Sequence, residues 1–173
     1  MLLVVGSGSS ATMRACEKRD GQWVSVMGTM SGHVGRNGVA PPGAKREGDG
    51  RTPSGTYLMG RGFGQHANPG VSFRWTIVDD RDVWVDDPSS SLYNSWQRAP
   101  ANGRWSSAEQ LRTTFYAYAQ VIDYNTARVP YRGSAIFLHL DHGSGTAGCI
   151  SLPRRQLLSV FRWERPGAQM VIR

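Results

Sequence analysis

The chain has 173 residues, a length that predicts one domain over residues 1–173 with a sizeable hydrophobic core. No stretch approaches about 18 consecutive apolar residues, so a membrane-spanning helix is not expected. The net charge is +7, but the basic residues are scattered and belong to no nucleic-acid-binding motif, which argues against nucleic acid as a partner.

The chain has only two cysteines, Cys16 and Cys149, and this count limits the disulfide and metal chemistry that it can support. A disulfide between them is possible in an exported protein, but it would consume the thiol on which the chemistry below depends. Two cysteines cannot form the usual zinc site, and no spacing of histidines and cysteines supplies the missing ligands, so no metal is expected. Cys16 is expected to be a buried or half-buried strand residue.

The first 27 residues predict an antiparallel meander. Strands are expected over Met1–Val5, Thr12–Glu17 and Gln22–Met27, and Asp20–Gly21 is a strong hairpin signal. We expect this meander to be packed by Val4, Val5, Trp23, Val24 and Val26. Met1–Val5 is too short for the core of a signal peptide, so the signal of an exported protein would have been removed or would lie outside this chain.

Glycine- and proline-rich loops alternate with short strands in the middle of the chain. Residues 30–43 predict a loop or a broken edge strand. Strands are expected over residues 56–59, 74–79 and 82–85. Asp86 and Asp87 follow the last of these strands, and as neighbours they would point to opposite faces, which favours a cap or turn over paired acid–base chemistry. In the loop that comes next, Tyr93 and Asn94 would either line a substrate groove or belong to a packed lid.

The last third of the chain mixes helix and strand signals. Ser106–Glu109 is a capping-box pattern, which predicts the start of a short helix. The apolar spacing from Leu111 to Ile122 fits a helix, while the residues from Tyr116 to Tyr124 favour a strand, so we expect a short helix followed by a strand. An amphipathic helix after Pro153 and a last strand at Met170–Ile172 complete the chain. The whole pattern predicts a mainly β fold, an antiparallel β-sandwich or barrel-like domain with one or two short helices.

The chemistry is concentrated in one stretch, Ser134–Pro153. A predicted strand there contains His139, a glycine-rich turn follows, and Gly148 then precedes Cys149. Such a turn can bring the imidazole and the thiol face to face, which is the minimal unit of covalent acyl transfer. Because Gly148 has no side chain, a substrate carbonyl can approach the amides of Gly148 and Cys149, which would form an oxyanion hole. The alternative is that Cys149 is a small buried apolar residue and His139 a hydrogen-bonded core histidine.

Three motifs in this order resemble the L,D-transpeptidase (YkuD-like) family. They are Ile136–His139 followed by Thr146–Ile150, the earlier stretch Lys45–Tyr57, and Trp84–Pro88 with Tyr93–Asn94. Together they extend over most of the chain. One position departs from the family pattern: many members have a second histidine just before the Gly-Cys pair, where this chain has Ala147. His139 is therefore the expected base.

The resemblance implies the same β fold and a peptidoglycan L,D-transpeptidase that acts on stem tetrapeptides. Cys149 would form a thioester acyl-enzyme, with His139 as base and then acid and the amides near Gly148 holding the oxyanion. Tyr93, Asn94 and Thr146 would bind substrate. No metal or organic cofactor is needed, and the resemblance also implies a carbapenem target that acts outside the cytoplasm, expected as a monomer.

Other functions stay open at this level. With water as the acceptor, the enzyme would be an L,D-carboxypeptidase. An inactive wall-binding module would have kept the fold, although retention of His139 and Cys149 argues against it. An unrelated cysteine hydrolase would require the two upstream motifs to be a coincidence.

Overall fold

Strands dominate the computed structural model, which describes residues 1–173. The strands are β1 (Leu2–Ser7), β2 (Ser10–Arg19), β3 (Gln22–Ser25), β4 (Met30–His33), β5 (Val39–Ala40), β6 (Thr52–Pro53), β7 (Gly55–Gly64), β8 (Trp75–Ile77), β9 (Asp82–Val85), β10 (Ser95–Arg98), β11 (Ala108–Gln110), β12 (Tyr118–Ile122), β13 (Phe137–Leu140), β14 (Ile150–Leu152) and β15 (Gln169–Ile172). The helices are the short 3₁₀ helix η1 (Thr114–Tyr116) and α1 (Arg154–Trp163). Neither helix is long and apolar enough to cross a membrane.

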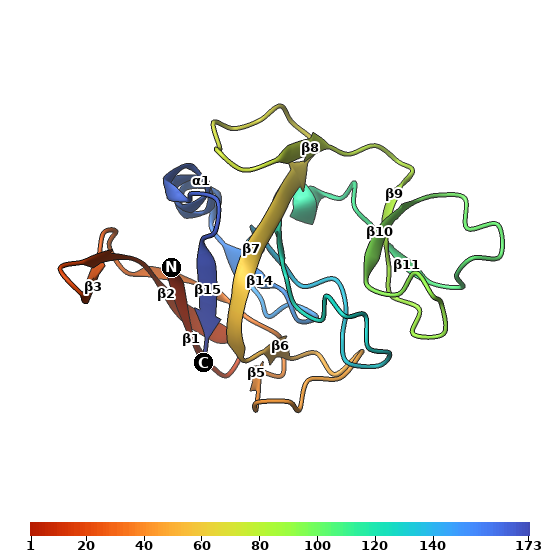
Figure 1. Ribbon diagram of the computed structural model, residues 1–173, viewed down its shortest axis with the longest axis horizontal. Helices are drawn as coiled ribbons and strands as arrows, with labels where there is room; N and C mark the ends of the chain where they lie inside the picture. Colours follow the sequence, from red (N-terminus) through yellow and green to blue (C-terminus); the bar gives the residue numbers. More distant parts are fainter.

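The main sheet closes on itself. Its strands follow the order β1-β15-β7-β12-β13-β14-β4-β2, and β2 then pairs with β1 again, which makes a ring of eight strands. Most neighbours are antiparallel, while β1 with β15 and β13 with β14 are parallel. Closure leaves the ring without free edges. The prediction of a mainly β, barrel-like fold with short helices is confirmed (Figure 1).

Apolar side chains fill the interior of this barrel and the space beneath α1. Leu2, Met13, Leu138, Ile150 and Met170, from five different strands, are fully buried in one cluster. The buried face of α1 joins the same cluster through Leu157, Val160 and Phe161. Pro153 directly precedes α1, and the helix ends before Pro166–Gly167, as the sequence predicts.

A second, smaller sheet of order β10-β9-β11 lies to one side of the barrel (Figure 1). Aromatic side chains pack between the two sheets in a separate cluster. Phe137 of β13 makes edge-to-face contacts with Phe63, Trp84 and Tyr116, at ring-centroid distances of 5.2 to 5.3 Å. These contacts attach the small sheet to the outer face of β13, and the candidate site lies at the margin of this cluster.

The N-terminal hairpin forms as predicted but packs differently. Asp20 and Gly21 connect β2 and β3 with φ angles of 48° and 82°, the left-handed conformations that a tight hairpin turn requires. Trp23 and Val24, predicted to pack the meander, are 53% and 40% exposed. The reason is that β3 pairs only with β2 and extends beyond the barrel, where no layer covers either face (Figure 1). Val5 is similarly exposed, whereas Val4 is fully buried.

Two local predictions are wrong. Residues 30–43 are neither a loop nor a broken edge, because they contain β4, which has β2 on one side and β14 on the other, and the short β5. Residues 106–109 do not start a helix. The amide and hydroxyl of Ser106 donate hydrogen bonds to Asp87, and Glu109 pairs with Trp84 of β9 as part of β11. Long-range strand pairing thus overrides the local capping pattern.

Candidate active site

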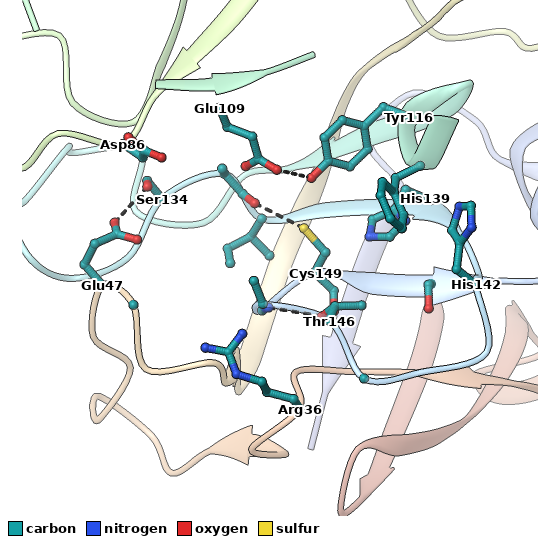
Figure 2. A pocket seen from close by; sticks show the side chains of 18 of the residues that line it. Arg36, Glu47, Asp86, Glu109, Tyr116, Ser134, His139, His142, Thr146 and Cys149 are labelled. Carbon is teal, nitrogen blue, oxygen red and sulfur yellow. Dashed lines mark hydrogen bonds between the residues drawn. The ribbon is translucent and has the colours of Figure 1, made fainter. Parts of the chain in front are cut away.

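A cavity of about 530 Å³ opens beside the small sheet. The strand β13, the segment before β14, the strand β11 and the helix η1 all contribute side chains to it. Its lining includes Arg36, Lys45, Glu47, Asp86, Glu109, Phe115, Tyr116, Ser134, His139, His142, Thr146, Gly148, Cys149 and Ser151 (Figure 2). The stretches around Lys45 and Ser134 therefore meet at one site.

His139 of β13 and Cys149, the residue directly before β14, lie on the same face of two adjacent parallel segments. The register pairs Leu138 with Ile150 and His139 with Ser151. Because side chains alternate along a strand, Leu138 and Ile150 point into the barrel, while His139 and Cys149 point outward into the cavity. The thiol and the imidazole that the sequence pairs are thus brought to one site.

The Cys149 thiol is held by backbone groups. Its Sγ donates to the carbonyl oxygen of Ala135 at 3.2 Å and accepts the amide N–H of Phe137 at 3.4 Å. Only 6% of the residue is exposed. Burial, and secondly the nearby carboxylate of Glu109, raise the pKa of the thiol to about 12. The resting group is therefore a neutral thiol.

His139 is 5% exposed, and a hydrogen bond fixes its tautomer. Nδ1 lies 2.8 Å from the carbonyl oxygen of Leu140, and because a carbonyl only accepts, Nδ1 must carry the proton. Nε2 is then an unprotonated acceptor. Burial lowers the pKa of the imidazole to about 4. Tyr116 packs against this ring edge-on at 5.2 Å and limits its rotation.

His142, the other histidine in the cavity, lies at its margin. Its ring packs against that of Phe115 with a centroid distance of 4.2 Å and an interplanar angle of 58°, and the structure contains no hydrogen bond from its side chain. In Figure 2 the His142 side chain lies on the far side of His139 from Cys149. His139 therefore matches the geometry expected of the base better than His142 does.

The turn before Cys149 is fixed by two threonine hydroxyls. Thr146 Oγ1 accepts the amide of Gly148 at 3.1 Å and donates to the carbonyl oxygen of Cys149 at 2.6 Å. Thr52 Oγ1 donates to the carbonyl oxygen of Gly148 at 2.8 Å and accepts the amide of Gly35 at the same distance. Thr146, predicted to bind substrate, lines the cavity and also braces this turn.

Gly148 adopts a φ of 153°, and a Cβ atom at this position would lie 3.0 Å from the carbonyl oxygen of Arg51. Glycine is therefore required here by conformation and by space. Its amide is already bonded to Thr146, whereas the amide of Cys149 has no hydrogen-bond partner in the protein. The Cys149 amide is thus the available donor for an oxyanion.

Tyr93 and Asn94, predicted to bind substrate, do not line the cavity. The Tyr93 hydroxyl donates to the carboxylate of Glu47 and accepts the amide of Gly133. Asn94 Oδ1 accepts from Trp84 Nε1 at 2.8 Å and from the amide of Ala135 at 3.2 Å. Both side chains are buried, because their polar ends are used to hold neighbouring segments in place. Asn94 thereby supports the backbone whose carbonyl accepts the thiol hydrogen bond.

The charged side chains of the cavity include two that sequence reasoning missed as site residues, Arg36 and Glu109. Lys45 Nζ forms an ion pair with Asp49 Oδ1 at 2.5 Å, whereas Arg36 is exposed and makes no ion pair. Glu109 accepts a hydrogen bond from the Tyr116 hydroxyl, and burial raises its pKa to about 7. No signal identified Glu109, because its local pattern favoured a helix.

Ser151, Asp141 and His33 form a neighbouring polar cluster. Asp141 Oδ1 accepts from Ser151 Oγ at 2.7 Å and lies 2.6 Å from His33 Nδ1. The carboxylate therefore sits between the hydroxyl and the imidazole. A serine nucleophile needs the imidazole in that middle position, so this cluster is not a serine-hydrolase triad. No group of three or more histidine, cysteine or acidic side chains is arranged to hold a metal ion.

The family model for the L,D-transpeptidase catalytic domain, YkuD, matches residues 9–172. The chain belongs to the YkuD family. The solved structures include a similar one, Mycobacterium tuberculosis L,D-transpeptidase 1, with 16% sequence identity and a TM-score of 0.43. That comparison covers 99% of this chain and 60% of the other, so the YkuD chain described here spans about three fifths of that protein. No curated protein sequence matches the chain.

Proposed function

We propose that this YkuD protein is a peptidoglycan L,D-transpeptidase that acts on stem tetrapeptides through a thioester on Cys149. The observation that carries the proposal is the placement of His139 of β13 and Cys149, directly before the adjacent strand β14, on one face in the cavity, with Nε2 of His139 free to accept a proton. A peptidoglycan substrate implies action outside the cytoplasm. Family membership supports the substrate class.

In the first half-reaction, Cys149 Sγ attacks the carbonyl of the third stem residue, and its proton passes to His139 Nε2. The resting pKa values, about 12 for the thiol and about 4 for the imidazole, favour the neutral pair, so proton transfer accompanies attack. The Cys149 amide donates to the developing oxyanion. His139 then protonates the departing nitrogen, the C–N bond breaks, and the thioester remains. Arg36, exposed and without an ion pair, is placed to bind a carboxylate of the stem peptide.

In the second half-reaction, an amine of a neighbouring stem attacks the thioester. His139, which gave its proton to the departing nitrogen, takes a proton from the amine and passes it to the sulfur as the C–S bond breaks. Attack by water instead would make the enzyme an L,D-carboxypeptidase. Neither route needs a metal or an organic cofactor.

Incubation with a disaccharide tetrapeptide, followed by mass spectrometry of the products, tests this function. A cross-linked dimer identifies a transpeptidase, and a tripeptide alone identifies a carboxypeptidase. Cys149→Ala removes the covalent route and should give neither product, while its circular dichroism spectrum should match that of the wild type. An unchanged substrate with folded wild-type protein would contradict the proposal and favour a wall-binding module.

A further inference from the structure

We infer that Glu109 binds the ammonium group of the acceptor and removes its first proton, so that it selects an amine over water in the second half-reaction. This inference rests on the proposed function, because it assigns a residue to the acceptor step of that reaction. It concerns a side chain that the thiol, the imidazole and the oxyanion donor do not need.

Glu109 is held at a fixed position in the cavity. It belongs to β11, where it pairs with Trp84 of β9, and its Oε1 accepts the Tyr116 hydroxyl. Tyr116 is itself buried and packs edge-on against Phe137 and His139. Figure 2 shows the carboxylate of Glu109 beside the Tyr116 hydroxyl, with Cys149 below both. A mobile surface carboxylate would not be fixed in this way.

The carboxylate of Glu109 has an open oxygen and no cation. Oε2 makes no hydrogen bond in the protein and is not among the fully enclosed polar atoms. No lysine or arginine forms an ion pair with Glu109. Of the two basic residues in the lining, Lys45 is bonded to Asp49 and to the carbonyl oxygen of Arg46, and Arg36 makes no ion pair. Carboxylates that are withdrawn from solvent normally have a positive partner. An ammonium group entering the cavity would supply it.

The charge of Glu109 opposes the first half-reaction. Its proximity contributes, after burial, to the raised pKa of Cys149, and so it disfavours negative charge on the sulfur. A carboxylate that hinders thiolate formation has no use in acylation. The acceptor step has the opposite requirement, because there a positive nitrogen must be bound and deprotonated.

The proton count of the acceptor step calls for a second base. An amine reaches the thioester as R–NH₃⁺ and must lose two protons as the C–N bond forms and the C–S bond breaks. One passes through His139 to Cys149 Sγ, and the other must go elsewhere. Water loses only one proton in the same step, and His139 alone can carry it. Glu109, with a pKa of about 7, can take the additional proton near neutral pH and release it to solvent.

Glu109→Gln tests the inference, because the amide oxygen of glutamine still accepts from Tyr116 but carries no charge and takes no proton. The measurements are the rate of acyl-enzyme formation with the disaccharide tetrapeptide and the ratio of dimer to tripeptide. We expect acylation at or somewhat above the wild-type rate, and a dimer-to-tripeptide ratio lower by roughly tenfold or more. Structural damage would instead lower both quantities together.

Glu164→Gln is the matched control. Glu164 is a buried glutamate whose pKa is raised to about 7 by burial, as that of half-buried Glu109 is, but it lies outside the cavity. It should change neither quantity. An unchanged product ratio in Glu109→Gln, a parallel loss of acylation and dimer in that variant, or a wild-type protein that acylates but forms no dimer would overturn the inference. A wild-type protein that does not acylate would refute the proposed function itself.

The pH dependence provides a second readout. The titratable groups facing Glu109 are Tyr116 from η1, Cys149 from the turn before β14, and the more distant carboxylates Asp86 and Glu47. In the wild type, the dimer-to-tripeptide ratio should rise as pH passes through about 7, because Glu109 must be ionised to act. In Glu109→Gln the dimer-to-tripeptide ratio should not rise near pH 7. Identical profiles in the two proteins would contradict the role of Glu109.

Discussion

Alkylation of Cys149 by iodoacetamide should still be accelerating at pH 10. Burial and the Glu109 carboxylate raise the pKa of this thiol from 9.0 to about 12, and only the thiolate is alkylated. The experiment varies only the pH and measures the alkylation rate of the wild-type protein without substrate. Between pH 7 and pH 10 the rate should increase about tenfold per pH unit and reach no plateau.

The raised pKa of Cys149 also sets how much slower its alkylation should be than that of an unperturbed thiol. Raising a thiol pKa from 9.0 to about 12 lowers the thiolate fraction near neutral pH by about a thousandfold. The more basic thiolate is also more nucleophilic, and a Brønsted coefficient of about 0.4–0.5 restores roughly 16- to 32-fold. The net rate at pH 7 should be about 30- to 60-fold below that of an unperturbed thiol, before any further loss from limited access.

The assay is quenched alkylation followed by peptide mapping, in a Cys16→Ser background that removes the other free thiol. A carbapenem should nevertheless acylate Cys149 at pH 7, because His139 takes the proton during attack. An alkylation rate that levels off below pH 8 would mean that a thiolate exists at rest. The neutral thiol and imidazole inferred from their burial would then be wrong.

Three further substitutions test the scaffold. Thr52→Val leaves the amide of Gly35 and the carbonyl of Gly148 without their partner and should lower the free energy of unfolding by about 1–3 kcal/mol in urea titrations, whereas exposed Thr29→Val should not. Gly148→Ala meets a φ of 153° and the carbonyl of Arg51 and should slow carbapenem acylation by more than roughly tenfold; a wild-type rate would show that this turn is not constrained. Glu164 has a folded pKa of about 7, above its ordinary 4.5, so its contribution to stability is complete below pH 4.5 and lost as pH rises through 7. Glu164→Gln should therefore raise the free energy of unfolding by up to about 3 kcal/mol at pH 8 and leave it unchanged at pH 4. Equal increases at the two pH values in urea titrations would contradict this.

Local chemistry predicted those parts of the fold that depend on a few neighbouring residues. Asp20–Gly21 forms its turn because both residues tolerate positive φ, and Pro153 precedes α1 as expected. The spacing from His139 to Gly148–Cys149 also suffices to bring imidazole and thiol into one cavity. Closure of the barrel through β1 and β2 depends on pairings between distant strands, which no local pattern specifies.

The remaining site residues depend on contacts far apart in the sequence. Tyr93 and Asn94 looked like groove residues because they are polar, yet their partners include Glu47 and Ala135, more than 40 residues away. Glu109 looked like a helix-start residue, and only the pairing of β11 with β9 turns it toward the cavity. Thr52 fixes the Gly148 turn across 96 residues. In each case the position of the side chain is decided by tertiary contacts.

Single-turnover acylation of His139→Gln is the most direct test of the Cys149–His139 pair. The wild type and the variant, both checked for folding by circular dichroism, are mixed with a carbapenem, and the adduct is followed by intact mass and mapped. We expect the wild-type adduct on Cys149 and a rate about 10²–10⁴-fold lower in His139→Gln, while His142→Ala changes the rate by less than roughly tenfold. A folded His139→Gln protein that acylates at the wild-type rate, or an adduct on Cys16 alone, would contradict the assignment.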